Sequence, residues 1–136
     1  MAKFGKITGL VNNAGGQFPQ AALEFSVKGW NAVIDTNLNG TWHMIQNAAK
    51  RWVRDGVPGS VVNIVVVTER GQPGISHSVA ARGGVIALSR SLALEWAPHR
   101  IRINCVAPGT IESNGFNNYR PENAENFCNS NPMKHN

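Results

Sequence analysis

The chain has few charged residues, two cysteines and a single tyrosine. No stretch is long and apolar enough to span a membrane, and the N-terminus lacks a signal-peptide pattern. Cys105 and Cys128 lack metal-ligand spacing, so we predict no metal site and an intracellular, cytoplasmic setting. The net charge of +5 is spread along the chain, which favours phosphate-bearing small molecules over nucleic acid as partners.

What is present is a pattern of alternating strands and helices. The 136 residues suffice for one small domain. Branched apolar runs predict buried strands, and apolar residues at three- and four-residue steps predict helices. The predicted elements are a strand at 7–11, a helix from Ser26 to about Asp55, a strand at 61–67, a helix from about Gly74 to Pro98 and a strand at 101–106. This β-α-β-α-β order implies parallel strands with right-handed crossovers, and therefore both helices on one face of the sheet.

The end of the first predicted strand carries the most informative motif. There the apolar run gives way to Asn12-Asn13-Ala14-Gly15-Gly16. Glycines let a backbone turn tightly and approach a ligand, and asparagine side chains can pin such a loop to neighbouring main chain. An ordinary exit from a strand explains an isolated motif of this kind equally well.

Further segments that occur in order along the chain decide how this motif is interpreted. The chain has Asp35-Thr36-Asn37-Leu38-Asn39-Gly40, then Leu92-Ala93-Leu94-Glu95, and finally a strand that runs from Arg102-Ile103-Asn104 to Pro108-Gly109. Together with Asn12–Gly15, these segments resemble the short-chain dehydrogenase/reductase family. The resemblance covers roughly residues 4–110. It implies an α/β fold, a three-layer Rossmann-type parallel sheet that binds NAD(P).

Two parts of the family pattern are absent from this sequence. No Gly-x-x-x-Gly-x-Gly occurs, although that turn seats the cofactor pyrophosphate on a helix N-terminus in the family. The chain also stops where the family enters its last helix and strand. We therefore expect residues 1–110 to be a partial NAD(P)-binding Rossmann domain and residues 111–136 a flexible substrate-loop segment. An uncovered apolar sheet face predicts a chain that is marginally stable or associates when alone.

The resemblance also implies a set of site residues. The catalytic positions are Asn37, Ser78 and Arg82, of which Ser78 and Arg82 replace the family's usual tyrosine and lysine. A serine is a much poorer proton donor than a phenol, and the only tyrosine, Tyr119, matches no catalytic position. The family's catalytic serine is also lost, with Thr68 the nearest hydroxyl. The cofactor positions are Asn13, Ala14, Gly15, Arg82, Pro108, Gly109 and Thr110.

One branch of the family departs from the pattern in the same way. His77-Ser78-Val79-Ala80-Ala81-Arg82 resembles the trans-2-enoyl-CoA and 2,4-dienoyl-CoA reductases, and Lys28-Gly29-Trp30 the peroxisomal trans-2-enoyl-CoA reductases in particular. This implies NADPH, or NAD as the alternative, and an acyl-CoA thioester as the substrate. A peroxisomal location follows only from the resemblance. The family also implies a homo-oligomer formed through the two long helices.

Three hypotheses stay open at this point. In the first, the parent protein is an enoyl-CoA reductase and this chain is inactive alone. In the second, the parent protein is an NAD(P)-dependent alcohol or ketone dehydrogenase. In the third, the chain is a non-catalytic assembly module or a truncated fragment. We expect His77 to be a solvated residue at a helix end. We expect Trp30, Trp42, Trp52 and Trp96 to be core or subunit-contact residues.

Overall fold

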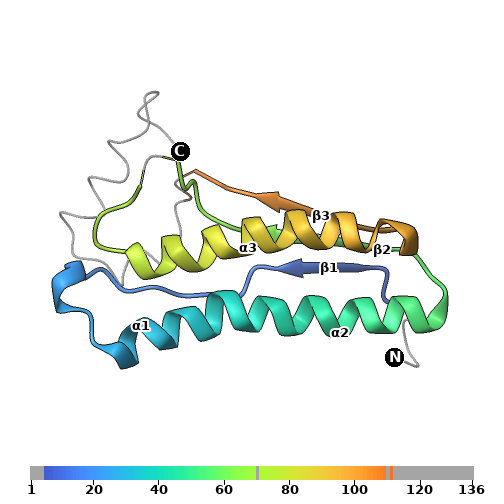
Figure 1. Cartoon of the computed structure of the whole chain (residues 1–136), viewed down its shortest axis with the longest axis horizontal. Helices are drawn as coiled ribbons and strands as arrows, with labels where there is room; N and C mark the ends of the chain where they lie inside the picture. The colour runs from blue at the N-terminus through green and yellow to red at the C-terminus, as the bar shows by residue number, and fades with distance from the viewer. Residues whose placement is uncertain (1–4, 70, 110, 112–136) are drawn as a thin grey trace.

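The computed structural model describes residues 5–69, 71–109 and 111. Its regular elements follow the predicted order (Figure 1). They are β1 (Gly9–Asn12), η1 (Ala22–Glu24), α1 (Val27–Ile34), the π-helical turn η2 (Asp35–Asn39), α2 (Gly40–Asp55), β2 (Gly59–Ile64), α3 (Ser76–Glu95), η3 (Ala97–His99) and β3 (Ile101–Val106). Apart from residue 111, the predicted substrate-loop segment lies outside the described residues.

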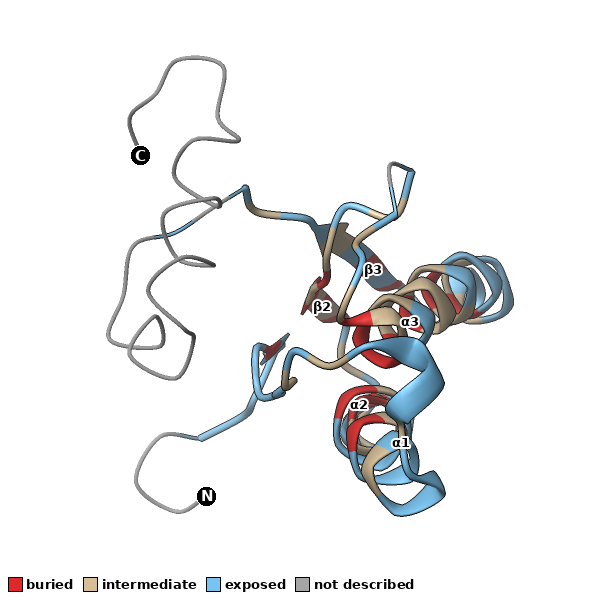
Figure 2. Ribbon diagram, turned by 90° about the vertical axis from the view of Figure 1, so that its left-hand side faces the viewer, coloured by how far each residue is buried: buried red, intermediate tan, exposed pale blue. Residues whose placement is uncertain are grey.

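The three strands form one parallel sheet in the order β1-β2-β3. Leu10 pairs with Val61, and Val61 pairs with Ile103, so these three residues lie side by side across the sheet. α2 and α3 lie side by side on one face of this sheet (Figure 2). This arrangement confirms the predicted β-α-β-α-β Rossmann-type sheet, and the described residues supply one of its helical layers.

The long first helix begins where the sequence predicted but is not regular throughout. The Ser26 hydroxyl accepts the Gly29 N–H at 3.0 Å and caps α1. Gly56, with a φ of 64°, ends α2 in the left-handed conformation. Between α1 and α2, the π turn Asp35–Asn39 inserts an extra residue into the helical repeat. Periodicity cannot detect one inserted residue, and such turns often occur at functional sites.

The second strand is shorter than predicted. β2 ends at Ile64 rather than at Val67, although the Val65 N–H still donates to the Val106 carbonyl at 2.9 Å. The neighbouring strand β1 has already ended at Asn12, which pairs with Asn63. The branched run beyond Ile64 therefore lacks a partner on that side, and apolar composition alone does not make a strand.

The core lies between the sheet and the helices α2 and α3. Trp52 is buried at its centre, and its indole N–H donates to the Ile7 carbonyl at 2.7 Å. The cluster of buried residues consists of Ile45, Ala49, Trp52, Val61, Leu92, Ile101 and Ile103. Trp42 and Trp96 pack against this cluster, as predicted, whereas Trp30 is 37% exposed. The core thus contains the aliphatic stripe that the helical periodicity had indicated.

A row of polar side chains crosses the same face of the sheet. Asn12, Asn63 and Cys105 occupy paired positions on the three strands. The Asn12 amide donates to the Asn63 carbonyl oxygen at 2.7 Å, and the Asn63 amide donates to the Ser89 hydroxyl of α3 at 2.9 Å. The Cys105 thiol donates to the same hydroxyl at 3.2 Å. These bonds fix the position of α3 over the strand ends.

We expect Asn63→Leu to lower the free energy of unfolding by about 2 kcal/mol. The substitution leaves the buried Asn12 amide without its acceptor, and one unsatisfied buried group costs about 1–3 kcal/mol. Urea unfolding followed by far-UV circular dichroism measures the loss. Asn104→Leu, at an exposed position on β3, is the matched control. Equal losses in the two variants would contradict the assignment.

The other face of the sheet has no helix over it among the described residues (Figure 2). Val11 and Val106 point to this side and are 64% and 47% exposed. Val62 and Ile64 of the central strand share the same face and are half-buried. The exposed valines agree with the predicted apolar surface that needs a cover.

No helix in the described part of the chain is long and apolar enough to cross a membrane.

Candidate functional site

The predicted site residues gather where the parallel strands end. The loops after β1 and β2 and the first turns of α3 meet at this edge of the sheet (Figure 1). In open α/β sheets, ligands bind at the carboxyl ends of the strands. The described residues of this edge form the candidate site.

Asn37 connects the π turn to the loop after β1. Its side-chain oxygen accepts the Gly16 N–H at 2.9 Å, and its amide donates to the Gly16 carbonyl at 2.9 Å. Asn37 is fully buried, and the Thr41 hydroxyl donates to its main-chain carbonyl at 2.8 Å. This reciprocal pair satisfies the buried amide and fixes the loop. Because Asn37 lies inside the π turn, its side chain points at this loop. A regular α-helix would not necessarily place it there.

Ser78 lies on the other side of Asn37. The Asn37 amide is 3.5 Å from the Ser78 hydroxyl oxygen, a long hydrogen bond, and Ser78 is 1% exposed. The Ser78 main-chain N–H donates to Nδ1 of His77 at 2.8 Å. The predicted pair of Asn37 and Ser78 is therefore in contact, although it lies beneath the surface.

Arg82 reaches across the site from the next turn of α3. Its Nη1 donates to the carbonyl of Ile64, the last residue of β2. The guanidinium also lies against Gly15, because a β-carbon at position 15 would fall 3.1 Å from Cζ of Arg82 and 2.8 Å from Oδ1 of Asn37. Only glycine leaves room for both groups. Burial lowers the pKa of Arg82 from its ordinary value, yet an arginine remains charged at neutral pH.

The predicted cofactor positions line the same edge at the surface. Asn13, Ala14 and Gly15 are exposed, directly after β1. Pro108 is half-buried and Gly109 exposed, shortly after β3. Thr110 lies outside the described residues. The site therefore has exposed loops above the buried Asn37 and Ser78 and the half-buried Arg82.

This combination of strand-end loops and buried polar residues matches a known family. The family model described as enoyl-(acyl carrier protein) reductase matches residues 1–136. The chain belongs to the short-chain dehydrogenase/reductase family. Its relationship to the family thus rests on the whole described fold and on the motifs at the strand ends.

Two curated relatives of this short-chain dehydrogenase/reductase differ in their substrates. A Bacillus subtilis protein, named a probable 2,4-dienoyl-CoA reductase, is 41% identical over 114 residues, which are 82% of this chain and 45% of the relative. The Escherichia coli 2-dehydro-3-deoxy-D-gluconate 5-dehydrogenase is 37% identical over 123 residues, which are 90% of this chain and 49% of the relative. The chain spans about half the length of the curated relatives it matches.

Solved structures agree with this assignment. A short-chain dehydrogenase from Bacillus anthracis has a TM-score of 0.85 at 39% identity, over 98% of this chain and 52% of that one. An Agrobacterium tumefaciens protein, described as a candidate 2-deoxy-D-gluconate 3-dehydrogenase with bound NADP, has a TM-score of 0.86 at 35% identity. The match covers 94% of this chain and 53% of that one.

The structure corrects one prediction about this short-chain dehydrogenase/reductase. His77 is fully buried rather than solvated. Its ring stacks on Phe25, with centroids 4.4 Å apart, and meets the edge of Phe18 at 4.6 Å. Nε2 of His77 is buried without a hydrogen-bond partner among the described residues. The two phenylalanines lie more than fifty residues earlier in the chain, so local sequence gave no signal of this packing.

Proposed function

We propose that this chain forms part of an NAD(P)-dependent oxidoreductase that reduces the C=C bond of an enoyl-CoA thioester. The observation that carries the proposal is the group of Asn37, Ser78 and Arg82 below the exposed Asn13–Gly15 loop. NADPH is the cofactor we favour. The likeness to a structure with bound NADP supports a pyridine nucleotide, with NAD as the alternative.

The donors in the site suit a nicotinamide ribose. Arginine has five N–H donors, and one of those of Arg82 is bonded to the Ile64 carbonyl. The Ser78 hydroxyl can donate its own proton while it accepts from Asn37. We propose that Arg82 and Ser78 hold the ribose hydroxyls, and that Pro108, Gly109 and Thr110 line the nicotinamide. The Asn13–Gly15 loop then lies on the adenosine side.

The residues of the chain suit reduction of an activated C=C bond better than reduction of a ketone. When bound, the nicotinamide supplies the hydride, and a proton from solvent completes the saturated product. Negative charge develops on the thioester oxygen during this reaction, and preorganised donors stabilise it. Asn37 fixes the loop after β1 through Gly16, and the half-buried Arg82 guanidinium is the donor nearest to the surface. A ketone needs a proton donor as strong as a phenol, which Ser78 is not.

An alcohol or ketone dehydrogenase is the alternative within the same class. The 37% identity to a 2-dehydro-3-deoxy-D-gluconate 5-dehydrogenase supports it. The rate of NADPH consumption with crotonyl-CoA, compared with the rate with a 5-keto sugar acid, distinguishes the two reactions. Turnover of the sugar acid alone would overturn the enoyl-CoA assignment.

A non-catalytic assembly module is the alternative from another class. The exposed Val11 and Val106 on the uncovered sheet face support it, as do Met44 and Leu94, which are 56% and 81% exposed on the long helices. We propose that a homo-oligomer forms through these helices. Analytical ultracentrifugation of the chain tests this, with Met44→Glu expected to weaken association. A monomer at all concentrations would contradict it.

Arg82→Gln provides the direct test of the cofactor site. We expect NADPH to give saturation-transfer NMR signals at its nicotinamide and ribose protons in the unsubstituted chain. The substitution removes a guanidinium that we place on the ribose, and we expect affinity to fall at least tenfold, equivalent to about 1.4 kcal/mol. Arg90→Gln changes the same charge at an exposed position of α3 and is the matched control. A folded chain without nicotinamide signals would contradict the proposal.

A further inference from the structure

A fully buried histidine at the start of α3 has no role in the proposed reaction. The ring of His77 stacks on Phe25 with centroids 4.4 Å apart, and Phe18 lies 4.6 Å away, almost perpendicular to it. The two phenylalanine centroids are 5.8 Å apart, far less than the sum of their distances from His77. The phenylalanines therefore do not lie on opposite faces of the imidazole, which fits into a corner between them.

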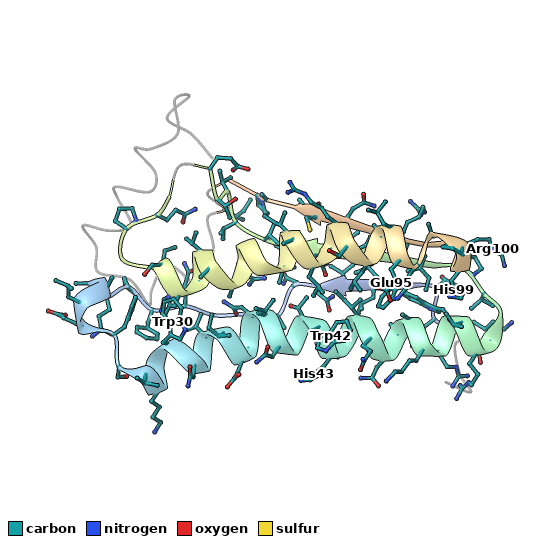
Figure 3. The ribbon with its side chains drawn as sticks, in the orientation of Figure 1. Trp30, Trp42, His43, Glu95, His99 and Arg100 are labelled. Atoms are coloured by element: carbon teal, nitrogen blue, oxygen red, sulfur yellow. The ribbon has the colours of Figure 1, made fainter. Side chains whose placement is uncertain are left out.

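Both phenylalanines belong to the segment between β1 and α1 and are also held from the side of α1. Phe25 meets Trp30 edge-on, with centroids 6.3 Å apart, at the end of the molecule where α1 begins (Figure 3). Phe18 packs against Gly29, since a β-carbon there would lie 3.0 Å from Cζ of the ring. Contacts on both sides thus fix the corner that receives the histidine.

The two ring nitrogens of His77 have different surroundings. Nδ1 accepts the Ser78 N–H at 2.8 Å, so in the neutral ring the proton lies on Nε2. Nε2 is buried without a hydrogen-bond partner in the described part of the chain, and an aromatic ring is only a weak acceptor. An unpaired buried donor lowers stability. Packing alone would therefore favour a phenylalanine at this position over a histidine.

The acceptor at Nδ1 supports the start of α3. A helix begins with N–H groups that lack partners within the helix, and Ile75, which precedes α3, has no side-chain oxygen to cap them. The Ser78 N–H is shared between the Ile75 carbonyl, at 2.9 Å, and Nδ1 of His77. Nδ1 therefore holds the main chain at Ser78, whose hydroxyl oxygen is 3.5 Å from the Asn37 amide.

We infer that His77 is a positioning residue of the candidate site. Its Nδ1 fixes the main chain at Ser78, and its ring holds the segment between β1 and α1. Asn37 anchors the same segment at Gly16, so the segment is fixed at two places. The inference rests on the proposed function, because the position of Ser78 matters to a ligand only if the ligand binds there. His77 itself lies beneath the surface and acts through Ser78 and the segment.

Two substitutions separate the two contacts of His77. His77→Phe keeps an aromatic ring and removes the acceptor, whereas His77→Asn keeps an acceptor near the place of Nδ1 and removes the ring. Hydrogen exchange followed by NMR measures both contacts, through the Ser78 amide and through the Gln20 amide, which donates to the Gly74 carbonyl at 2.8 Å. In His77→Phe we expect the Ser78 amide to exchange about fivefold faster, as for the loss of one hydrogen bond, and the Gln20 amide to be unchanged. We expect the reverse in His77→Asn.

NADPH affinity shows whether this positioning serves the site. We expect both variants to bind NADPH about fivefold more weakly than the unsubstituted chain. The urea midpoint of His77→Phe should not fall, because the substitution removes an unpaired buried donor, so global stability cannot explain its weaker binding. His99→Phe and His99→Asn make the same changes at an exposed position and should leave exchange and affinity unchanged.

These measurements separate a failure of the inference from a failure of the proposed function. Unchanged exchange of the Ser78 and Gln20 amides would overturn the inference. Global unfolding of both His77 variants would also overturn it, because it would assign His77 to the core alone. NADPH binding with unchanged affinity in both variants would overturn it and leave the oxidoreductase role standing. The expected exchange pattern without NADPH binding would support His77 as the residue that positions Ser78 and contradict the oxidoreductase role.

Discussion

Gly59→Ala is expected to lower the free energy of unfolding by about 3 kcal/mol, at the upper end of the usual cost of overpacking. A β-carbon at position 59 would overlap the indole of Trp52, only 2.5 Å from Cζ3. Trp52 is 1% exposed and bonded to the Ile7 carbonyl, so its ring has no room to move. Relief of the overlap requires β2 and α2 to separate. Urea unfolding followed by tryptophan fluorescence measures the loss.

Gly9→Ala is the matched control for this prediction. Gly9 is also a strand residue, but a β-carbon there would meet only the Ser60 carbonyl oxygen, at an ordinary 3.9 Å. We therefore expect a change within about 0.5 kcal/mol of zero, as for most surface substitutions. If the two variants were equally stable, Trp52 would not pack against β2 as described.

Asn37→Asp is expected to cost about 3 kcal/mol or more of stability at neutral pH and to abolish NADPH binding. The carboxylate has the shape of the amide, yet it places a negative oxygen against the Gly16 carbonyl that now accepts the amide N–H. It also buries a charge at a fully buried position, and the Arg82 guanidinium beside Gly15, which already donates to the Ile64 carbonyl, offsets only part of that cost. The loop that contains Gly15 and Gly16 loses half of its anchor. Urea unfolding at neutral pH gives the stability loss, and NADPH titration gives the loss of binding.

The pH dependence of the free energy of unfolding of Asn37→Asp shows whether the buried carboxylate causes the loss of stability. Burial and the facing Gly16 carbonyl raise the pKa of the new carboxyl, and the Arg82 guanidinium lowers it. We expect burial to outweigh the guanidinium, so the destabilisation is present above the folded-state pKa and falls as the acid becomes protonated. The protonated acid can again donate to the Gly16 carbonyl. Asn31→Asp, at an exposed position of α1, is the control and should lack this pH dependence. A stability loss that does not change with pH would contradict the buried amide pair.

The experiments on Asn37 and Arg82 examine different parts of one site. Asn37 holds the loop after β1, and Arg82 joins that loop to the end of β2. A loss of NADPH binding in both variants supports a site formed at the strand ends. A loss in Asn37→Asp alone would indicate that Arg82 only supports the fold.

The sequence by itself determined the order and type of the elements. Branched apolar runs and helical periodicity depend on neighbouring residues, and they predicted β1, β2, β3 and the two helical crossovers. The start of the first long helix at Ser26 and its end near Asp55 are likewise local and were predicted at the correct residues. The motif at Asn12–Gly15, together with the segments in register after it, indicated the family, whose sheet the structure shares.

Only the tertiary structure decided how the site is arranged. The fit of Arg82 against Gly15, the amide pair of Asn37 with Gly16 and the burial of His77 between Phe18 and Phe25 all join residues distant in sequence. The π turn depends on a single inserted residue, which periodicity averages away. Local patterns specify which face of an element is apolar, but the partners of a buried polar group depend on packing between elements.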